Sequence, residues 1–310
     1  MRFSVQPWAP EYGSSSSIEL EEQLQVDPDV EVKTSEWTAL QVNAEPAEEV
    51  LFVDGVRRID ANLWLEGPDQ VPTLALAASY AAGAVLANHR ATVVAEEVRR
   101  GVFSSAANAE SIVTRHAIYE VHLTSGVTSE ELWLGLQNQM AVLEGQMAVQ
   151  FADVPLLVVD GPLSHHRTLS EAVGYIKTQH VHYLPPHLRP VLLQLRPGDR
   201  TPLFLVATGS RQWHRLSWYL RLPMAGGGPM DGIVRAELNA DRDISSARRR
   251  ADLMAATVCR YASEGHKDPR APQNLYPVGG LERRLRRLLG DPELLYRSLR
   301  RAAAMVTVPG

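Results

Sequence analysis

The fold class of this chain depends first on residues 49–66, EVLFVDGVRRIDANLWLE. It opens with a compact apolar run, Leu51 to Val53, that ends in Asp54-Gly55. Beyond this dipeptide, Val56, Ile59 and Leu63 continue the apolar pattern. We predict a buried strand, a turn at Asp-Gly and a second strand.

The segments around this stretch extend a sheet and then add helices. Residues 73–87 and 91–103 are apolar and predict an antiparallel meander, although the Ala-rich residues 75–86 also fit a helix. Residues 128–152 carry apolar residues at three- and four-residue spacing behind an N-cap, which predicts an amphipathic helix. The run Leu156 to Val159, within residues 153–163, predicts a strand buried on both faces.

The remaining elements give the fold class. We expect helices and strands alternating in the second half of the chain, which predicts an α/β protein with a mixed sheet flanked by helices. These elements are a helix at 168–176, strands at 190–195, 202–208, 213–222 and 231–238, and helices at 245–262 and 281–303.

Composition limits the class of protein. The 310 residues are 45% hydrophobic and 22% charged, which is typical of a soluble globular protein. No run approaches the length of a membrane span, and the first residues lack the basic and apolar pattern of a secretory signal. Cys259 is the single cysteine, so we expect neither an internal disulfide nor a cysteine-based zinc site. We therefore expect an intracellular protein with no membrane contact.

The net charge of -5 hides a gradient along the chain. Residues 1–50 hold eleven acids against two basic residues, whereas residues from 245 onward hold thirteen Lys or Arg against six acids. A basic surface at the C-terminal end could face an anionic partner, or the arginines could lie on solvated helix faces.

Two apolar runs end in the same dipeptide, LFVDG at 51–55 and LLVVDG at 156–161. An Asp at the end of a buried strand, followed by Gly, can face a ligand, although Asp-Gly is also a common turn dipeptide. Two such carboxylates side by side repel unless one is protonated or a cation lies between them. Asp54 and Asp160 are therefore candidate metal ligands.

A third acid, Glu144, lies on the apolar face of the helix expected at 128–152. A buried carboxylate is costly unless it is paired or metal-bound, whereas a carboxylate at the edge of the stripe could reach solvent. With Asp54 and Asp160 it would form an all-oxygen cluster suited to Mg²⁺ or Mn²⁺. Two such ions hydrolyse phosphodiesters in nucleases.

These residues resemble a known family. A strand ending in VDG, a helix carrying a Glu, a second strand ending in VVDGPL, then GYIKT and later GIVRAEL look like a NurA-type nuclease. The stretch DPRAPQNLYPVGGLERRLRRLLGD resembles the closing segment of the bacterial branch. The resemblance covers roughly residues 48–300, so we expect an acidic arm at 1–47 and a nuclease domain at 48–310.

The resemblance implies a fold and a function. It implies an RNase H-like core with C-terminal basic helices and a manganese-dependent nuclease acting on DNA ends, with Mg²⁺ as the alternative cofactor. It also implies a homodimer that works with a HerA-type hexameric ATPase in end resection, in the cytoplasm and associated with the nucleoid. Digestion polarity and strand preference are not implied.

The resemblance also assigns residues. Asp54, Glu144 and Asp160 would bind the metal ions, and Lys177 of GYIKT would lie near the scissile phosphate as a catalytic charge. Archaeal relatives end in P-x-x-L-x-x-A-[HD], whereas YPVGGLERRLRR has Arg where that acid or imidazole would fall. A fourth ligand must then come from elsewhere, and Asp268 is the first candidate.

Other candidates complete the expected site. Asn274 is a second candidate for the missing ligand, and Tyr276 matches the family's tyrosine. On a helix, Arg283, Arg286 and Arg287 share a face that could bind DNA phosphates.

Two other functions fit parts of the sequence. The segment HVHYLPPH, 180–187, could bind zinc through His180 and His182, with His187 or His165-His166 completing the site; this predicts a zinc hydrolase. Alternatively, an RNase H-like domain can persist as a catalytically weak scaffold or DNA-binding subunit.

Overall fold

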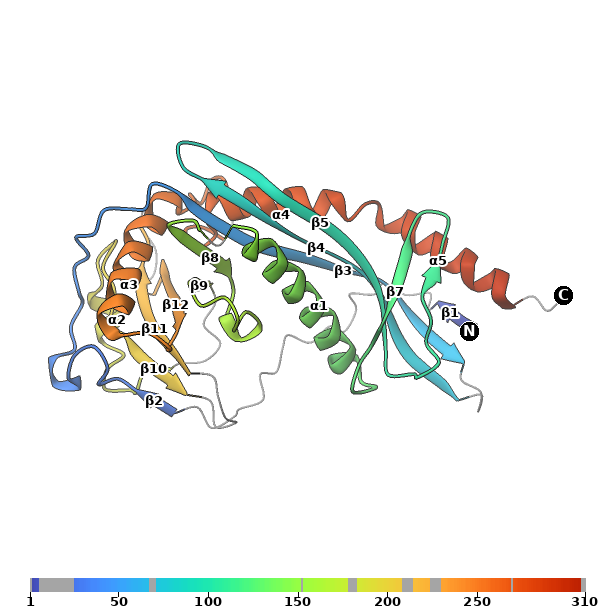
Figure 1. The fold of residues 1–310 in the computed structure, drawn as a ribbon, viewed down its shortest axis with the longest axis horizontal. Coiled ribbons are helices and arrows are strands. Elements are labelled where there is room, and N and C mark those ends of the chain that lie inside the picture. Colours follow the sequence, from blue (N-terminus) through green and yellow to red (C-terminus); the bar gives the residue numbers. More distant parts are fainter. Residues whose placement is uncertain are drawn as a thin grey trace.

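The computed structural model describes residues 2–5, 25–66, 71–151, 153–177, 183–207, 214–223, 230–268 and 270–307. Within these residues the chain is an α/β protein built on one mixed twelve-stranded sheet (Figure 1). Eleven strands follow the order β2-β10-β11-β12-β9-β8-β3-β4-β5-β7-β6, and β1 pairs with the far end of β3. The predicted class, a mixed sheet flanked by helices, is confirmed.

The strands have these bounds: β1 Arg2–Val5, β2 Gln25–Asp27, β3 Val50–Glu66, β4 Pro72–Ala87, β5 Ala91–Ser104, β6 Ile112–Val113, β7 Ile118–Leu123, β8 Leu156–Asp160, β9 Ala172–Ile176, β10 Phe204–Ala207, β11 His214–Arg221 and β12 Ile233–Asn239. The helices are α1 Ser129–Val149, α2 Val191–Gln194, α3 Ile244–Val258, α4 Tyr276–Leu288 and α5 Pro292–Thr307. Strands β3, β4 and β5 form the predicted antiparallel meander, and β8 and β9 are parallel to β3.

The long strand β3 replaces the predicted strand, turn and strand. Asp54 and Gly55 stay in extended pairing with Gly83 and Ala82 of β4, so the dipeptide makes no turn. The only irregularity lies between Ile59 and Ala61, where a bulge shifts the register. The bulge changes which residues face the helices, because an extra residue reverses the alternation of side chains.

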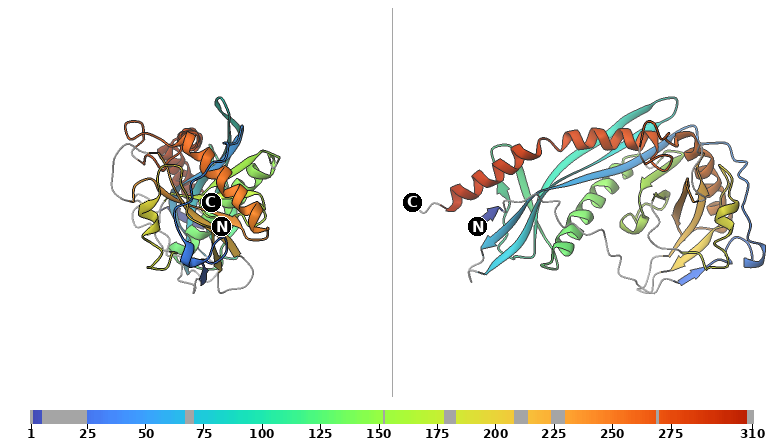
Figure 2. Two further views of the ribbon diagram at one scale, coloured as in Figure 1. Left: turned by 90° about the vertical axis from the view of Figure 1, so that its left-hand side faces the viewer. Right: turned by 180° about the vertical axis from the view of Figure 1, so that it is seen from behind.

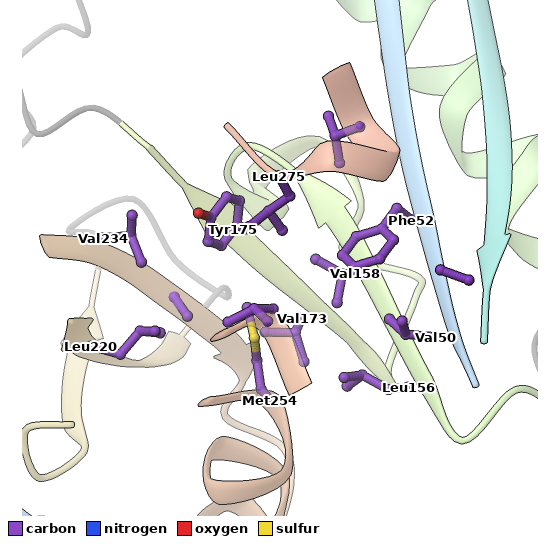
Figure 3. Close-up of a cluster of buried hydrophobic side chains, with 14 of the residues drawn as sticks. Val50, Phe52, Leu156, Val158, Val173, Tyr175, Leu220, Val234, Met254 and Leu275 are labelled. Atoms are coloured by element: carbon purple, nitrogen blue, oxygen red, sulfur yellow. The ribbon is translucent and has the colours of Figure 1, made fainter. Parts of the chain in front are cut away.

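Helices cover both faces of the sheet (Figure 2). α1 begins with a capping box, in which Thr128 and Glu131 satisfy each other's backbone, and packs on the face that carries Leu51 and Val53. α3 and α4 pack on the opposite face, against Val50 and Phe52. Figure 3 shows that core, in which side chains from β3, β8 and β9 meet those of the helices.

Three predicted elements differ from the structure. Residues 172–176 form strand β9 rather than part of a helix, because the apolar run AVGYI is paired with both β8 and β12. Residues 191–194 form the short helix α2 rather than a strand. The single helix predicted at 281–303 is two helices, broken at Gly290, which has a φ of +81° that disfavours other residues.

Described parts of the predicted N-terminal arm belong to the sheet. β1 pairs with β3, and β2 pairs with β10. The carboxylate of Glu31 is bound by both terminal nitrogens of Arg200 at 2.9 Å and accepts a hydrogen bond from the backbone N–H of Leu203 at 2.7 Å. None of the helices in the described ranges is both long and apolar enough to cross a membrane.

Candidate metal centre

The carboxylates of Asp54 and Asp160 lie on the same face of the sheet, Asp54 within β3 and Asp160 at the end of the neighbouring parallel strand β8. Asp54 comes two residues after Phe52, and Asp160 comes two residues after Val158. Phe52 and Val158 both lie in the core shown in Figure 3. Side chains two residues apart on a strand point to the same face. β3 and β8 are paired in parallel up to Val53 and Val159, so the two aspartates that follow lie beside each other on adjacent strands.

Helix α4 supplies the third carboxylate. Glu282 is buried and follows Leu281, whose side chain packs over Gly83 on β4. Gly83 is paired with Asp54, so α4 lies directly over this aspartate. One oxygen from each of Asp54, Asp160 and Glu282 lies within 4.8 Å of the others. Three carboxylates from three elements therefore converge at one point.

The surroundings of Asp54 disfavour the charged form of its carboxylate. Its Oδ1 accepts a hydrogen bond from the backbone N–H of Gly55 at 2.8 Å, but its buried Oδ2 has no hydrogen-bond partner. Burial, and next the negative charge of Asp160, raise the pKa of Asp54 well above its ordinary value. Burial also raises the pKa of Asp160, although the charge of Lys177 opposes this effect. A bound cation would relieve both effects, because it favours the charged carboxylates.

Lys177, one residue beyond the end of β9, supplies positive charge to this group. Its ammonium donates hydrogen bonds to Asp160 and, at 2.8 Å, to Oδ1 of Asn274, and it lies 3.8 Å from Glu282. Lys177 shares the sheet face of Tyr175, two residues earlier. The structure therefore brings the predicted catalytic lysine into contact with a predicted metal ligand.

Asp268 contacts residues that surround the three converging carboxylates. It accepts hydrogen bonds from Asn274 at 2.6 Å and from the backbone of Arg270 at 2.8 Å. Arg270 in turn donates two hydrogen bonds to Glu282, at 3.1 and 2.6 Å. Burial raises the pKa of Glu282, but Arg270 and Lys177 lower it overall. Asp268 thus orients the groups that hold Glu282 and Lys177, and it does not join the three converging carboxylates.

Glu144 lies on the opposite face of the sheet. Its Oε2 is 3.0 Å from Nε2 of His166, and its Oε1 lies against Gly55, 2.4 Å from where a Cβ would stand. Gly55 faces α1, whereas Asp54 faces α4, because adjacent residues of a strand point to opposite faces. The structure therefore does not bring the predicted ligand Glu144 into the group that contains Asp54 and Asp160.

Glu282 was missed by the sequence analysis, although a signal was present. It lies between Leu281 and Leu285, which are both buried, so it is an acid on the apolar side of an amphipathic helix. That is the same pattern that singled out Glu144. Arg284, in the stretch that departs from the family's closing motif, forms an ion pair with Glu96.

The predicted DNA-binding residues are on the surface. Arg283, Arg286 and Arg287 are exposed on α4. Tyr276 is 37% exposed, and its hydroxyl accepts a hydrogen bond from Lys267 at 3.2 Å.

Only some of the histidines predicted to bind zinc belong to the described residues. His180 and His182 lie outside the described residues. His187 is exposed, and Nε2 of His166 lies 3.0 Å from Oε2 of Glu144. Across the described ranges, the one group of three or more potential ligands is the carboxylate set, which contains no histidine.

Comparison with known proteins adds no assignment: no protein-family model matches the chain, and no curated protein is significantly similar to it.

Proposed function

We propose that this protein is a metal-dependent nuclease that hydrolyses phosphodiester bonds at DNA ends. The observation that carries the proposal is the convergence of Asp54, Asp160 and Glu282 within 4.8 Å, beside the ammonium of Lys177. An all-oxygen set of this kind suits Mn²⁺ or Mg²⁺ better than zinc. The partnerless Oδ2 of Asp54 supports the fit, since a buried carboxylate oxygen without a donor is suited to a cation.

The residues divide into two roles. Asp54, Asp160 and Glu282 would hold the cation, which when bound activates water and stabilises charge on the phosphate. Lys177 sits between Asp160 and Glu282, where its charge can attract a phosphate oxygen and stabilise the transition state. Arg270 and Asn274 would keep Glu282 and Lys177 in place through the hydrogen bonds described above.

The finer assignment belongs to the same proposal. The meander β3-β4-β5, the helix α1 and the parallel strands β8 and β9 are compatible with an RNase H-like core. The motif order that resembles NurA-type nucleases supports action on DNA ends, in a homodimer that works with a HerA-type ATPase. In that case the exposed arginines of α4 would bind DNA phosphates without sequence preference.

The test is a nuclease assay on linear duplex and single-stranded DNA with Mn²⁺, comparing wild type with Asp54→Asn, Asp160→Asn and Glu282→Gln. We expect each variant to lose at least a hundredfold in rate, the scale of losing a key electrostatic group. Calorimetric titration with Mn²⁺ measures metal binding independently of activity. Wild-type activity that persists in all three variants would refute the site.

Glu144→Gln is the matched control, because it removes the same charge from the other side of β3. Full activity and normal Mn²⁺ binding in this variant would favour the ligand set seen in the structure. A loss as large as that of Glu282→Gln would favour the set implied by the family resemblance. An inactive wild type that still binds DNA would support the scaffold function instead.

A further inference from the structure

A cleft of about 370 Å³ lies between helix α5 and the turn that joins β6 to β7. Figure 1 places α5 and β7 at the end of the molecule away from β8, which carries Asp160. The cleft is lined by Val113, Thr114, Arg115, His116, Leu294, Arg297, Ser298, Arg301, Ala302 and Met305. This set contains three arginines, one histidine and two hydroxyls, but no acid.

The positive charge of this cleft is largely uncompensated. Across the described residues, Arg115 and Arg301 form no ion pair. Arg297 lies 3.8 Å from Glu293, one turn earlier on α5, but both side chains are well exposed, and such surface pairs are weak. Arginine side chains that converge from two elements without a carboxylate favour an anion with several oxygen acceptors.

The cleft is aligned with other basic residues. α4 and α5 follow each other along one side of the molecule (Figures 1 and 2). Arg286 and Arg287 are exposed on α4, and Arg300 and Arg301 are exposed on α5. Arg301 follows Glu282 by 19 residues, which would span at most about 28 Å at the rise of an α-helix. This length corresponds to about eight base pairs of duplex DNA.

We propose that this cleft binds backbone phosphates of the nucleic acid whose end is at the carboxylate cluster, with Arg115 and Arg301 as the main contacts. The inference rests on the proposed function. It makes the cleft a distant anchor that adds affinity for DNA long enough to reach it. Ser298 supplies a hydroxyl beside the two arginines, whereas the hydroxyl of Thr114 donates its hydrogen bond to the backbone carbonyl of Ala117.

The first test measures binding without cleavage. Labelled 30-base-pair DNA is titrated in EDTA with wild type, with Arg115→Gln/Arg301→Gln, and with the control Arg90→Gln/Arg260→Gln. Both control arginines are exposed, lie outside the cleft and remove the same charge. We expect the cleft variant to bind roughly tenfold more weakly and to lower the slope of log K against log salt by about 1.8. Equal losses in the cleft and control variants would overturn the proposal.

The second test uses length. In the Mn²⁺ nuclease assay, the cleft variant should raise KM for a 30-base-pair substrate but not for a 6-base-pair substrate, which is too short to reach the cleft. A KM raised equally for both lengths would contradict a distant anchor. If wild type proves inactive, the EDTA binding test still decides the cleft, so failure of the nuclease proposal and failure of the anchor are distinguishable.

Discussion

At the scale of single residues, Asp54 determines how the candidate site behaves without a metal. Burial and Asp160 raise its pKa, and its Oδ2 has no partner. A carboxyl whose pKa is higher in the folded state stabilises the fold below its unfolded pKa. That contribution is lost as the pH rises through the folded pKa. The metal-free protein should therefore be less stable at neutral pH than an otherwise identical protein with a neutral residue at this position.

The first prediction follows from this cost. In EDTA, Asp54→Asn should melt at a higher temperature than wild type at pH 7, and the difference should shrink as the pH falls. Mn²⁺ should stabilise wild type, by about 2.7 kcal/mol at a hundredfold excess over Kd, and should leave the variant unchanged. Thermal melts from pH 4 to 8 measure both effects. An Asp54→Asn variant that is less stable than wild type in EDTA throughout this range contradicts the prediction.

Gly55 explains how Glu144 reaches the sheet. A Cβ at this position would stand 2.4 Å from Oε1 of Glu144 and 2.9 Å from Cγ of Met140. Gly55→Ala should therefore destabilise the protein by about 1–3 kcal/mol, because the helix or the carboxylate must move. Gly280→Ala is the control: nothing lies within 4 Å of its Cβ position on α4, so it should stabilise by roughly 0.5–1 kcal/mol. Urea unfolding of both variants gives the comparison.

At the scale of elements, the sequence patterns predicted those with strong periodicity. α1 has a capping box and a long apolar stripe, and the prediction at 128–152 is close to Ser129–Val149. The pattern at 168–176 was ambiguous, because AVGYI is too short for its period to separate strand from helix. Its pairing with β8 and β12, far apart in sequence, decided the outcome.

Two of the three carboxylates of the site could be predicted from local sequence. Each aspartate ends an apolar run, so Asp54 and Asp160 could be proposed from local sequence. The burial of Glu282 depends on how α4 packs over Gly83, a contact between distant segments that no local pattern records. The predicted ligand Glu144 is buried, but it lies against Gly55, on the face of β3 opposite to Asp54. This opposition follows from the alternation of residues along the folded strand.

Besides the pairing of β1 and β2, a buried ion pair between Glu31 and Arg200 connects the N-terminal segment to the rest of the fold, which gives a third prediction. The side chains of Glu31 and Arg200 are 0% and 2% exposed. Glu31→Gln should destabilise by about 1–3 kcal/mol, because Arg200 loses the carboxylate that accepts from both of its terminal nitrogens and, of its ion pairs, keeps only the one with Asp252. The exposed Glu36→Gln should have little effect, and urea unfolding at pH 7 compares the two.

The pH dependence of the Glu31 pair has the opposite sign to that of Asp54. Burial raises the pKa of Glu31, but hydrogen bonds from Arg200 and its positive charge lower it overall. A lowered pKa contributes stability above the unfolded pKa of about 4.3, which is lost as the pH falls. The difference between wild type and Glu31→Gln should therefore shrink in acid. A difference that grows as the pH falls below 5 would be inconsistent with this pair.

At the scale of the whole molecule, β3 joins all parts of the sheet. Its 17 residues pair with β8 at one end, with β1 at the other and with β4 along nearly the whole length. Three hydrophobic clusters share this strand: one under α3 and α4, one under α1 and one under α5. The candidate centre lies where β3, β8 and α4 meet, so a cation there would connect a helix to the sheet.

This arrangement gives the last prediction, for hydrogen exchange with and without Mn²⁺. A cation bound by Asp54, Asp160 and Glu282 should slow exchange in α4 and in residues 270–275, since it adds a link between the helix and two strands. α5 should not change, because the break at Gly290 separates it from α4 and its own contacts are with β1, β3 and β6. Asp54→Asn should abolish the effect, whereas Glu144→Gln should retain it. Protection that rises equally in α4 and α5 would mean that the cation acts on the whole fold, and would argue against a centre confined to the junction of β3, β8 and α4.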